Sequence, residues 1–229
     1  MTKTLIEIVN LKKSFEHKNG NIDLFHNVNL KVRKGDLIAL VGPSGSGKSS
    51  FLHLLALLDE PNRGKVLLNN KDTKKLDDEQ KDLIRRNKIS IIFQDNNLLS
   101  DFTALENIIM PLIIRGEKKS SSIIKATKIL KEVKIFNRIN HFPSELSGGE
   151  QQRVAIARSL IAETDIILAD EPTGNLDYKT SEDIFSYFLK LKKMGKAVIF
   201  ATHNRELANK ADYKLSISRG TIKRANARP

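Results

Sequence analysis

The sequence predicts an α/β fold in which a largely parallel sheet carries an inserted lobe of helices. Short apolar runs of the kind found in buried strands alternate with helical segments, which is typical of a parallel sheet. Between about residues 96 and 162 this alternation gives way to mostly helical periodicity. Ahead of the sheet, two alternating segments joined by a polar turn predict an antiparallel portion. We expect residues 1–229 to form a single domain.

The expected elements follow one another along the chain. Strands are predicted at 5–11, 24–32, 37–41, 65–68, 89–93, 166–170, 197–202, 215–217 and 221–223. Helices are predicted at 50–58, 78–87, 120–133, 148–162, 179–193 and 206–209, and a further helix begins at 104 and is kinked or ended by Pro111 within about a turn. In a capping box, a polar N-cap residue and a Glu or Gln three positions later each satisfy a backbone N–H group of the other. Three such boxes begin helices, namely Asp77/Gln80, Thr103/Glu106 and Ser147/Glu150.

Composition excludes several classes of protein. The chain has 229 residues, of which 40% are hydrophobic and 29% charged, and this is ordinary globular composition. It has no cysteine, which excludes disulfides and thiolate metal sites. Residues 1–7 lack the apolar core of a signal peptide, and no apolar run approaches the length of a membrane-spanning helix. We expect that the chain does not enter a membrane by itself.

The chain is basic, with 39 Lys and Arg against 27 Asp and Glu, a net charge of +12. The lysines are spread along the chain, as at 71–75, 117–119 and 190–196, without interleaved aromatic residues. This pattern favours a solvated surface, attracted to an acidic membrane face, over a dedicated nucleic-acid groove. We therefore expect no direct contact with nucleic acid.

The strongest motif is a phosphate-binding loop, G-x-x-x-x-G-K-[ST], placed between a predicted strand and a predicted helix. Glycines let successive N–H groups converge on an anion, and the following helix adds its positive end. The lysine would reach the β- and γ-phosphates of a nucleotide, and the last serine would ligate Mg²⁺. The residues expected at the nucleotide are Gly42, Pro43, Ser44, Gly45, Ser46, Gly47, Lys48, Ser49 and Ser50.

Further polar residues stand where predicted strands end. Asp170 and Glu171 follow a buried strand; Asp170 would hold Mg²⁺ through its water shell, and Glu171 would act as general base on the attacking water. His203 could contact the γ-phosphate, and Gln94 could ligate the metal or sense the γ-phosphate. Alone, a histidine or glutamine at a strand end is more often an ordinary loop residue. The set as a whole favours a site.

A second anion site is predicted at the start of the helix near residue 148. The Ser147 hydroxyl and the N–H groups of Gly148 and Gly149 could hold a phosphate there. A second phosphate cradle is redundant within one ATP site, but it makes sense if it closes on the nucleotide of another copy. The alternative is an ordinary helix cap, which the Ser147/Glu150 box would also explain.

Taken together and in this order, these motifs resemble the ATP-binding-cassette (ABC) ATPases over essentially the whole chain. The motifs are GPSGSGKS, Gln94, LSGGEQ, IILADE, NLD at 175–177 and His203. The resemblance implies a head-to-tail dimer with two ATP molecules between the copies, and Asp177 signalling across the interface. Phe15 falls where the family usually stacks a tyrosine on adenine, and Asn204 falls where an aspartate often follows the histidine.

Residues 98–112 further resemble the subgroup of lipoprotein-releasing, macrolide-exporting and cell-division ATPases, and residues 101–107 together with 141–146 resemble the lipoprotein-releasing type most closely. That resemblance implies a peripheral subunit at the cytoplasmic face of the inner membrane. Two integral membrane subunits would handle the lipoprotein cargo, and the segment after Gln94 would receive their coupling helix. A cell-division ATPase and a soluble, nucleic-acid-directed cassette remain alternatives. The length argues against the exporter type, whose cassette is fused to a membrane domain.

Overall fold

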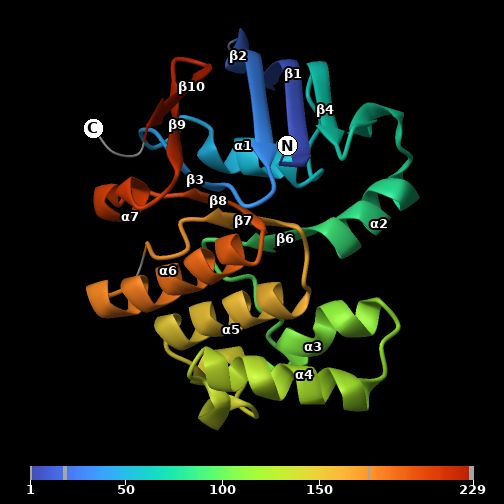
Figure 1. Ribbon diagram of the computed structural model, residues 1–229, viewed down its shortest axis with the longest axis vertical. Helices are drawn as coiled ribbons and strands as arrows, with labels where there is room; N and C mark the ends of the chain where they lie inside the picture. Colours follow the sequence, from blue (N-terminus) through green and yellow to red (C-terminus); the bar gives the residue numbers. More distant parts are fainter. Residues whose placement is uncertain (1, 18–19, 175, 227–229) are drawn as a thin grey trace.

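The computed structural model describes residues 2–17, 20–174 and 176–226. Figure 1 shows an antiparallel sheet at one end, a second sheet in the middle and a group of helices at the other end. The predicted fold class, a parallel-sheet core with an antiparallel N-terminal portion and a helical lobe, is confirmed.

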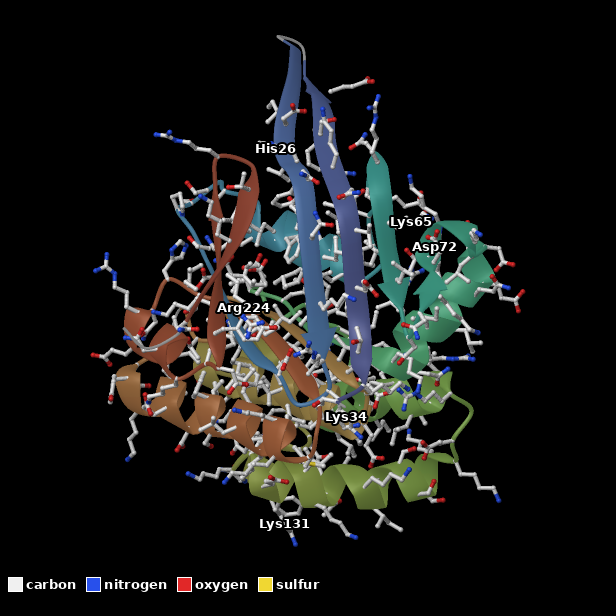
Figure 2. The ribbon with its side chains drawn as sticks, turned by 45° about the horizontal axis from the view of Figure 1, so that its top comes forward. His26, Lys34, Lys65, Asp72, Lys131 and Arg224 are labelled. Atoms are coloured by element: carbon white, nitrogen blue, oxygen red, sulfur yellow. The ribbon has the colours of Figure 1, made fainter. Side chains whose placement is uncertain are left out.

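The antiparallel sheet has the strand order β2-β1-β4-β5. Its strands are β1 (Thr4–His17), β2 (Gly20–Arg33), β4 (Arg63–Leu68) and β5 (Lys71–Asp72). The first two are longer than predicted, because irregularities in the β1–β2 register absorb the residues that break the alternation. Asn10 and Asn27 adopt left-handed backbone conformations there, which asparagine tolerates. The short β5 was not predicted; Lys65 and Asp72 lie side by side where it pairs with β4 (Figure 2).

The second sheet has the strand order β10-β9-β3-β8-β7-β6. Its strands are β3 (Leu37–Val41), β6 (Ile89–Ile92), β7 (Ile166–Asp170), β8 (Ala197–Ala201), β9 (Tyr213–Ser218) and β10 (Thr221–Asn226). All neighbours are parallel except the closing hairpin of β9 and β10. The hairpin turn meets the antiparallel sheet, since the backbone N–H of His26 donates to the Gly220 carbonyl at 2.9 Å (Figure 2).

Helices cover both faces of the parallel sheet (Figure 1). The buried residues of α1 (Lys48–Leu55) share a core with β1 and β2 on one face of this sheet, and Phe25 meets Phe51 edge to face there. On the other face, α5 (Gly148–Ile161) and α6 (Tyr178–Lys193) share a second core with α3 (Ala104–Ile114) and α4 (Lys119–Glu132). The remaining helices are α2 (Asp78–Lys88), α7 (Arg205–Asn209) and the 3₁₀ turns Thr73–Lys75, Phe136–Arg138 and Pro143–Glu145.

All three predicted capping boxes are confirmed, at the starts of α2, α3 and α5. Pro111 lies inside α3, which ends three residues later at Ile114. Within residues 2–17, 20–174 and 176–226, no helix combines the length and the apolar character needed to cross a membrane.

The α3 cap makes stability depend on pH. The backbone N–H and the hydroxyl of Thr103 donate to the Glu106 carboxylate and lower its pKa. A lowered pKa in the folded state stabilises the fold above the unfolded-state pKa, and this contribution is lost as pH falls through the folded-state pKa. We expect Glu106→Gln to lower the free energy of unfolding by about 0.5 kcal/mol near pH 7, and by less below pH ~4. Urea denaturation across pH measures this, with Glu79→Gln in α2 as control.

Candidate functional site

The parallel strands bring the predicted site residues to one edge of the sheet. Along that edge the neighbouring strands are β3, β8, β7 and β6. The phosphate loop follows β3, His203 follows β8, the acidic pair ends β7, and Gln94 follows β6. The strands also end level, because Ala201 pairs with both Leu40 and Asp170. Residues that are far apart in the sequence therefore surround one space.

The phosphate loop runs directly into α1. Gly47 is the N-cap at φ 96°, a conformation that favours glycine. Among the described residues, no side chain caps this helix, and the buried Ser46 hydroxyl has no hydrogen-bond partner. A Cβ on Gly42 would lie 2.6 Å from Ser46 Oγ, so the loop can close this tightly only with glycine there. Uncapped N–H groups and an unpartnered hydroxyl suit an anion such as a nucleotide phosphate.

Lys48 is nearly buried inside this loop. Its ammonium donates to the carbonyls of Gly42 and Pro43 at 3.2 and 3.3 Å. Its Nζ also lies 3.2 Å from His203 Nε2. A cation held at the centre of the loop provides the positive charge that a polyphosphate requires.

Glu171 is held in place by the end of the neighbouring strand. Its backbone N–H donates to the Ala201 carbonyl at 3.2 Å, and its Oε2 accepts the backbone N–H of His203 at 3.3 Å. Its Oε1 lies 3.2 Å from His203 Nε2, although the geometry is not that of a hydrogen bond. Glu171 has a φ of 44°, the left-handed region, which costs conformational free energy for a non-glycine residue. In this backbone conformation the Glu171 carboxylate lines the cavity.

A cavity of about 750 Å³ opens along this edge of the sheet. Eleven of the predicted residues line it: Phe15, Ser44, Gly45, Gly47, Lys48, Ser49, Ser50, Gln94, Asp170, Glu171 and His203. Gly42, Pro43 and Ser46 complete the loop behind them.

The donor groups in the cavity fit a hard divalent cation. The Ser49 hydroxyl, the Gln94 amide and the Asp170 carboxylate all present oxygen. Mg²⁺ takes oxygen ligands, commonly one or two carboxylates together with phosphates and water. Within the described ranges no group of three or more His, Cys, Asp or Glu side chains could hold a metal by itself. The residues present therefore fit Mg²⁺ that arrives with a nucleotide.

Phe15 lies at the rim of the cavity with part of its ring exposed. Lys13, two positions earlier on β1, places its ammonium 4.7 Å from the centre of that ring. Lys13 is itself nearly buried, and it donates to Asp59 at 2.5 Å and to the Glu60 carbonyl at 2.9 Å. The aromatic ring thus rests on a fixed cation.

Ser147, Gly149 and Asp177 lie in a different cavity, of about 620 Å³, with Gly148 beside them at the start of α5. Leu176 lines both cavities. Asp177 caps α6; its carboxylate accepts from the Thr180 hydroxyl at 2.6 Å and from the Thr180 backbone N–H at 3.0 Å, and both bonds lower its pKa. Within one chain, therefore, the structure does not bring these four residues to the phosphate loop. Asn175 of the NLD motif lies outside the described residues.

Six cavity residues were not predicted from the sequence, namely Leu24, Thr173, Gly174, Tyr178, Ser181 and Thr202, and Leu176 and Asn204 were named only within the family motifs. The helical spacing of Tyr178 and Ser181 just after Asp177 was a signal for two of them. Leu24 comes from β2, which pairs with the part of β1 that carries Phe15. For Lys13 the sequence held no signal, because its partner Asp59 is 46 positions away.

Asn204 stands where an aspartate is common in the family, and its role is now visible. It is the N-cap of α7: its Oδ1 accepts the backbone N–H groups of Glu206 and Leu207 at 2.9 and 3.1 Å. An amide oxygen does this as well as a carboxylate, without adding a negative charge beside the cavity.

Comparison with known proteins identifies the class. The ABC transporter family matches residues 25–174. The chain belongs to this family, and its phosphate loop, acidic strand end and glycine-rich helix start make it one of the ATP-hydrolysing cassettes.

Within that class, particular proteins are similar over almost the whole length. The Lipoprotein-releasing system ATP-binding protein LolD of Rickettsia bellii is 44% identical over 97% of this chain and 99% of its own. LolD of Colwellia psychrerythraea is 42% identical over 97% of this chain and 86% of its own. The solved dimeric structure of MJ0796, a bacterial ABC transporter cassette, superposes with a TM-score of 0.93 and 38% identity, covering 98% of this chain and 100% of that one. A post-hydrolysis state of MJ0796 bound to ADP and Pi superposes equally well, at 37% identity.

The Asn204 cap leads to a stability prediction. We expect Asn204→Ala to lower the free energy of unfolding by about 1 kcal/mol, because two N–H groups of α7 lose their acceptor. Asn204→Asp keeps the acceptor and should stay within about 0.5 kcal/mol of the parent chain. Denaturant titration followed by circular dichroism measures both. Equal losses for the two variants would contradict the assigned cap.

Proposed function

We propose that this chain is the ATP-hydrolysing subunit of a transporter complex that releases lipoproteins from the inner membrane. The observation that carries the proposal is the near-full-length similarity to LolD proteins. The cavity supports it, because it gathers the side chains that phosphoryl transfer to water requires.

In this proposal each part of the cavity has one task. Lys48 and the loop amides hold the β- and γ-phosphates, and Phe15 stacks on the adenine ring. Ser49, Asp170 and Gln94 hold Mg²⁺, which neutralises phosphate charge. Glu171 takes the proton of the attacking water, and the His203 imidazole contacts the γ-phosphate.

We further propose that the site is completed by a second copy of the chain. Ser147, Gly148, Gly149 and Asp177 lie in the separate cavity, so they can act on a nucleotide only from another copy. The carboxylate of Glu150 holds the Ser147 backbone N–H at 2.8 Å, and Arg138 donates to the same carboxylate at 2.8 Å. Both bonds lower the pKa of Glu150 and keep the start of α5 rigid. The similar cassette MJ0796 was solved as a dimer, which supports an assembly of two copies.

A groove of about 700 Å³ is the proposed docking place for the two membrane subunits. It runs between α2, β6, α3 and α5, next to the segment that follows Gln94. Leu83 and Ile114 line it with about half of their surfaces exposed, and Arg85, Arg86 and Arg158 surround them. Glu79 and Asp82 line it as well, and an apolar strip bordered by charges of both signs suits a short amphipathic helix. We propose that the chain lies at the cytoplasmic face of the inner membrane. We further propose that it forms a single domain, in which the helical lobe spans about residues 96–162.

Capture of the partners tests the proposal. Glu171→Gln should bind ATP but lose hydrolysis, because the amide cannot accept the proton of the attacking water, and we expect a fall of at least about a hundredfold in turnover. An affinity-tagged Glu171→Gln chain, taken from native membranes with ATP, should retain two lipoprotein-releasing membrane subunits, identified by mass spectrometry. Lys48→Ala is the matched control, and it should lose ATP affinity and the ATP-dependent part of the capture.

Each alternative has its own outcome in this experiment. Recovery of a division protein would assign the chain to the cell-division type, and recovery of a macrolide-export membrane protein to the exporter type. Nucleic acid without any membrane protein would contradict the transporter proposal. Wild-type turnover in Glu171→Gln would remove Glu171 from its role as general base.

The cation beneath Phe15 leads to a binding prediction. We expect Lys13→Met to weaken ATP binding about threefold, since the ring loses the charge that holds and polarises it. Binding of tripolyphosphate, which has no base to stack, should be unchanged. Lys12→Met is the matched control, because Lys12 pairs with Asp23 instead. Calorimetric titration measures all three chains, and an equal loss for both ligands would contradict the role.

A further inference from the structure

Gln94 lies in a tight turn directly after β6. The Asn96 backbone N–H closes the turn on the Phe93 carbonyl at 3.1 Å, with Gln94 and Asp95 between them. Asn96 and Asn97 then adopt left-handed conformations, at φ 59° and 44°. Asparagine tolerates such conformations, so they shape this segment without fixing it to the rest of the fold.

The side chain that fixes this segment belongs to Arg158 of α5. Arg158 donates through Nη2 to the Asn96 carbonyl at 2.7 Å and through Nη1 to the Asn97 carbonyl at 2.9 Å. Burial lowers the pKa of this guanidinium. The two bonds form a fork that fits two successive carbonyls, which a lysine ammonium cannot reproduce. One residue thus joins the turn that carries Gln94 to the helix that begins at Ser147.

The far end of the same loop is fixed to α3. Asn107 is fully buried; its Oδ1 accepts the Leu99 backbone N–H at 2.8 Å, and its Nδ2 donates to the carbonyls of Leu99 and Phe102 at 3.0 and 2.9 Å. A buried amide with all these partners is a rigid anchor. The segment is therefore fixed at two points, by Arg158 at its start and by Asn107 at its end.

We propose that Arg158 is a positioning residue, which holds the Gln94 turn on α5 and thereby sets where the Gln94 amide lies in the nucleotide cavity. Its guanidinium also lines the groove between α2, α3 and α5. A partner helix bound in that groove would contact the same side chain that donates hydrogen bonds to the turn. The expected effect on ATP turnover rests on the proposed function of Gln94 at Mg²⁺. The hydrogen bonds between Arg158 and the Gln94 turn do not depend on that function.

Hydrogen exchange in the nucleotide-free protein tests whether Arg158 holds the Gln94 turn on α5. We expect Arg158→Met to speed exchange in the segment 93–97 by about tenfold or more, because the turn loses two bonds to a charged donor. Arg115→Met is the matched control: Arg115 donates to the carbonyls of Arg86 and Ala162 near the same groove, at 3.0 and 2.7 Å. It should leave exchange at 93–97 unchanged. If Arg158→Met does not fold, Arg158→Lys keeps the charge and should still speed exchange in this segment.

A double-mutant cycle tests the consequence for catalysis. ATP turnover is measured for the wild type, Gln94→Ala, Arg158→Met and the double variant. If Arg158 acts through Gln94, the double variant should lie within about twofold of Gln94→Ala alone. Arg115→Met combined with Gln94→Ala should instead show the product of its two single effects.

Unchanged exchange at 93–97 in both Arg158 variants would overturn the inference, and so would a cycle in which the losses multiply. Gln94→Ala with wild-type turnover would overturn the role through Gln94. None of these results bears on which membrane proteins are captured, so they leave the proposed transporter function standing. Failure of the Glu171→Gln chain to capture any membrane protein, together with faster exchange in Arg158→Met, would contradict that function and support the inference.

Discussion

The level, parallel pairing of β3, β8 and β7 is the constraint on which the nucleotide cavity depends. Ala201 of β8 pairs with Leu40 on one side and with Asp170 on the other, so the three strands end together. The residues that follow are therefore forced to one edge, and Glu171 bonds back to Ala201 there. A slip of one residue would turn every side chain of a strand to the opposite face of the sheet. Alternate residues of these strands pack into two different cores, so a slip would exchange close-packed side chains between them and is opposed.

Two helices use the same physical property, their positive N-terminal ends, in opposite ways. The start of α1 has no side-chain cap within the described part of the chain, and its loop and Lys48 surround the free N–H groups. The start of α5 is already capped by Ser147, with Glu150 and Arg138 holding it rigid. The first leaves its N–H groups open to a phosphate, while the second presents a helix start that is already ordered by its own side chains. That difference suits a nucleotide bound by one copy and covered by another.

Buried and partly buried polar side chains tie the segments around the cavity to the scaffold. Lys13 joins the strand of Phe15 to the turn after α1, Arg158 joins the Gln94 turn to α5, and Asn107 joins the next loop to α3. Each would be costly to bury without its partners, so each specifies one arrangement of loops that carry little regular structure. Apolar packing alone sets position less sharply, because it lacks direction.

The sequence by itself determined the kinds of element and most of the chemistry. The phosphate loop, Asp170-Glu171, His203 and the capping boxes follow from local rules of spacing, so their residues could be named in advance. The strand order β3-β8-β7-β6 and the pairing of Lys13 with Asp59 or of Arg158 with Asn96 follow no local rule. The full length of β1 and β2 was also not predicted, because pairing between the two strands overrides breaks in the alternation of each. Only the tertiary structure decided which named residues share a cavity, since contacts between distant segments depend on packing of the whole core.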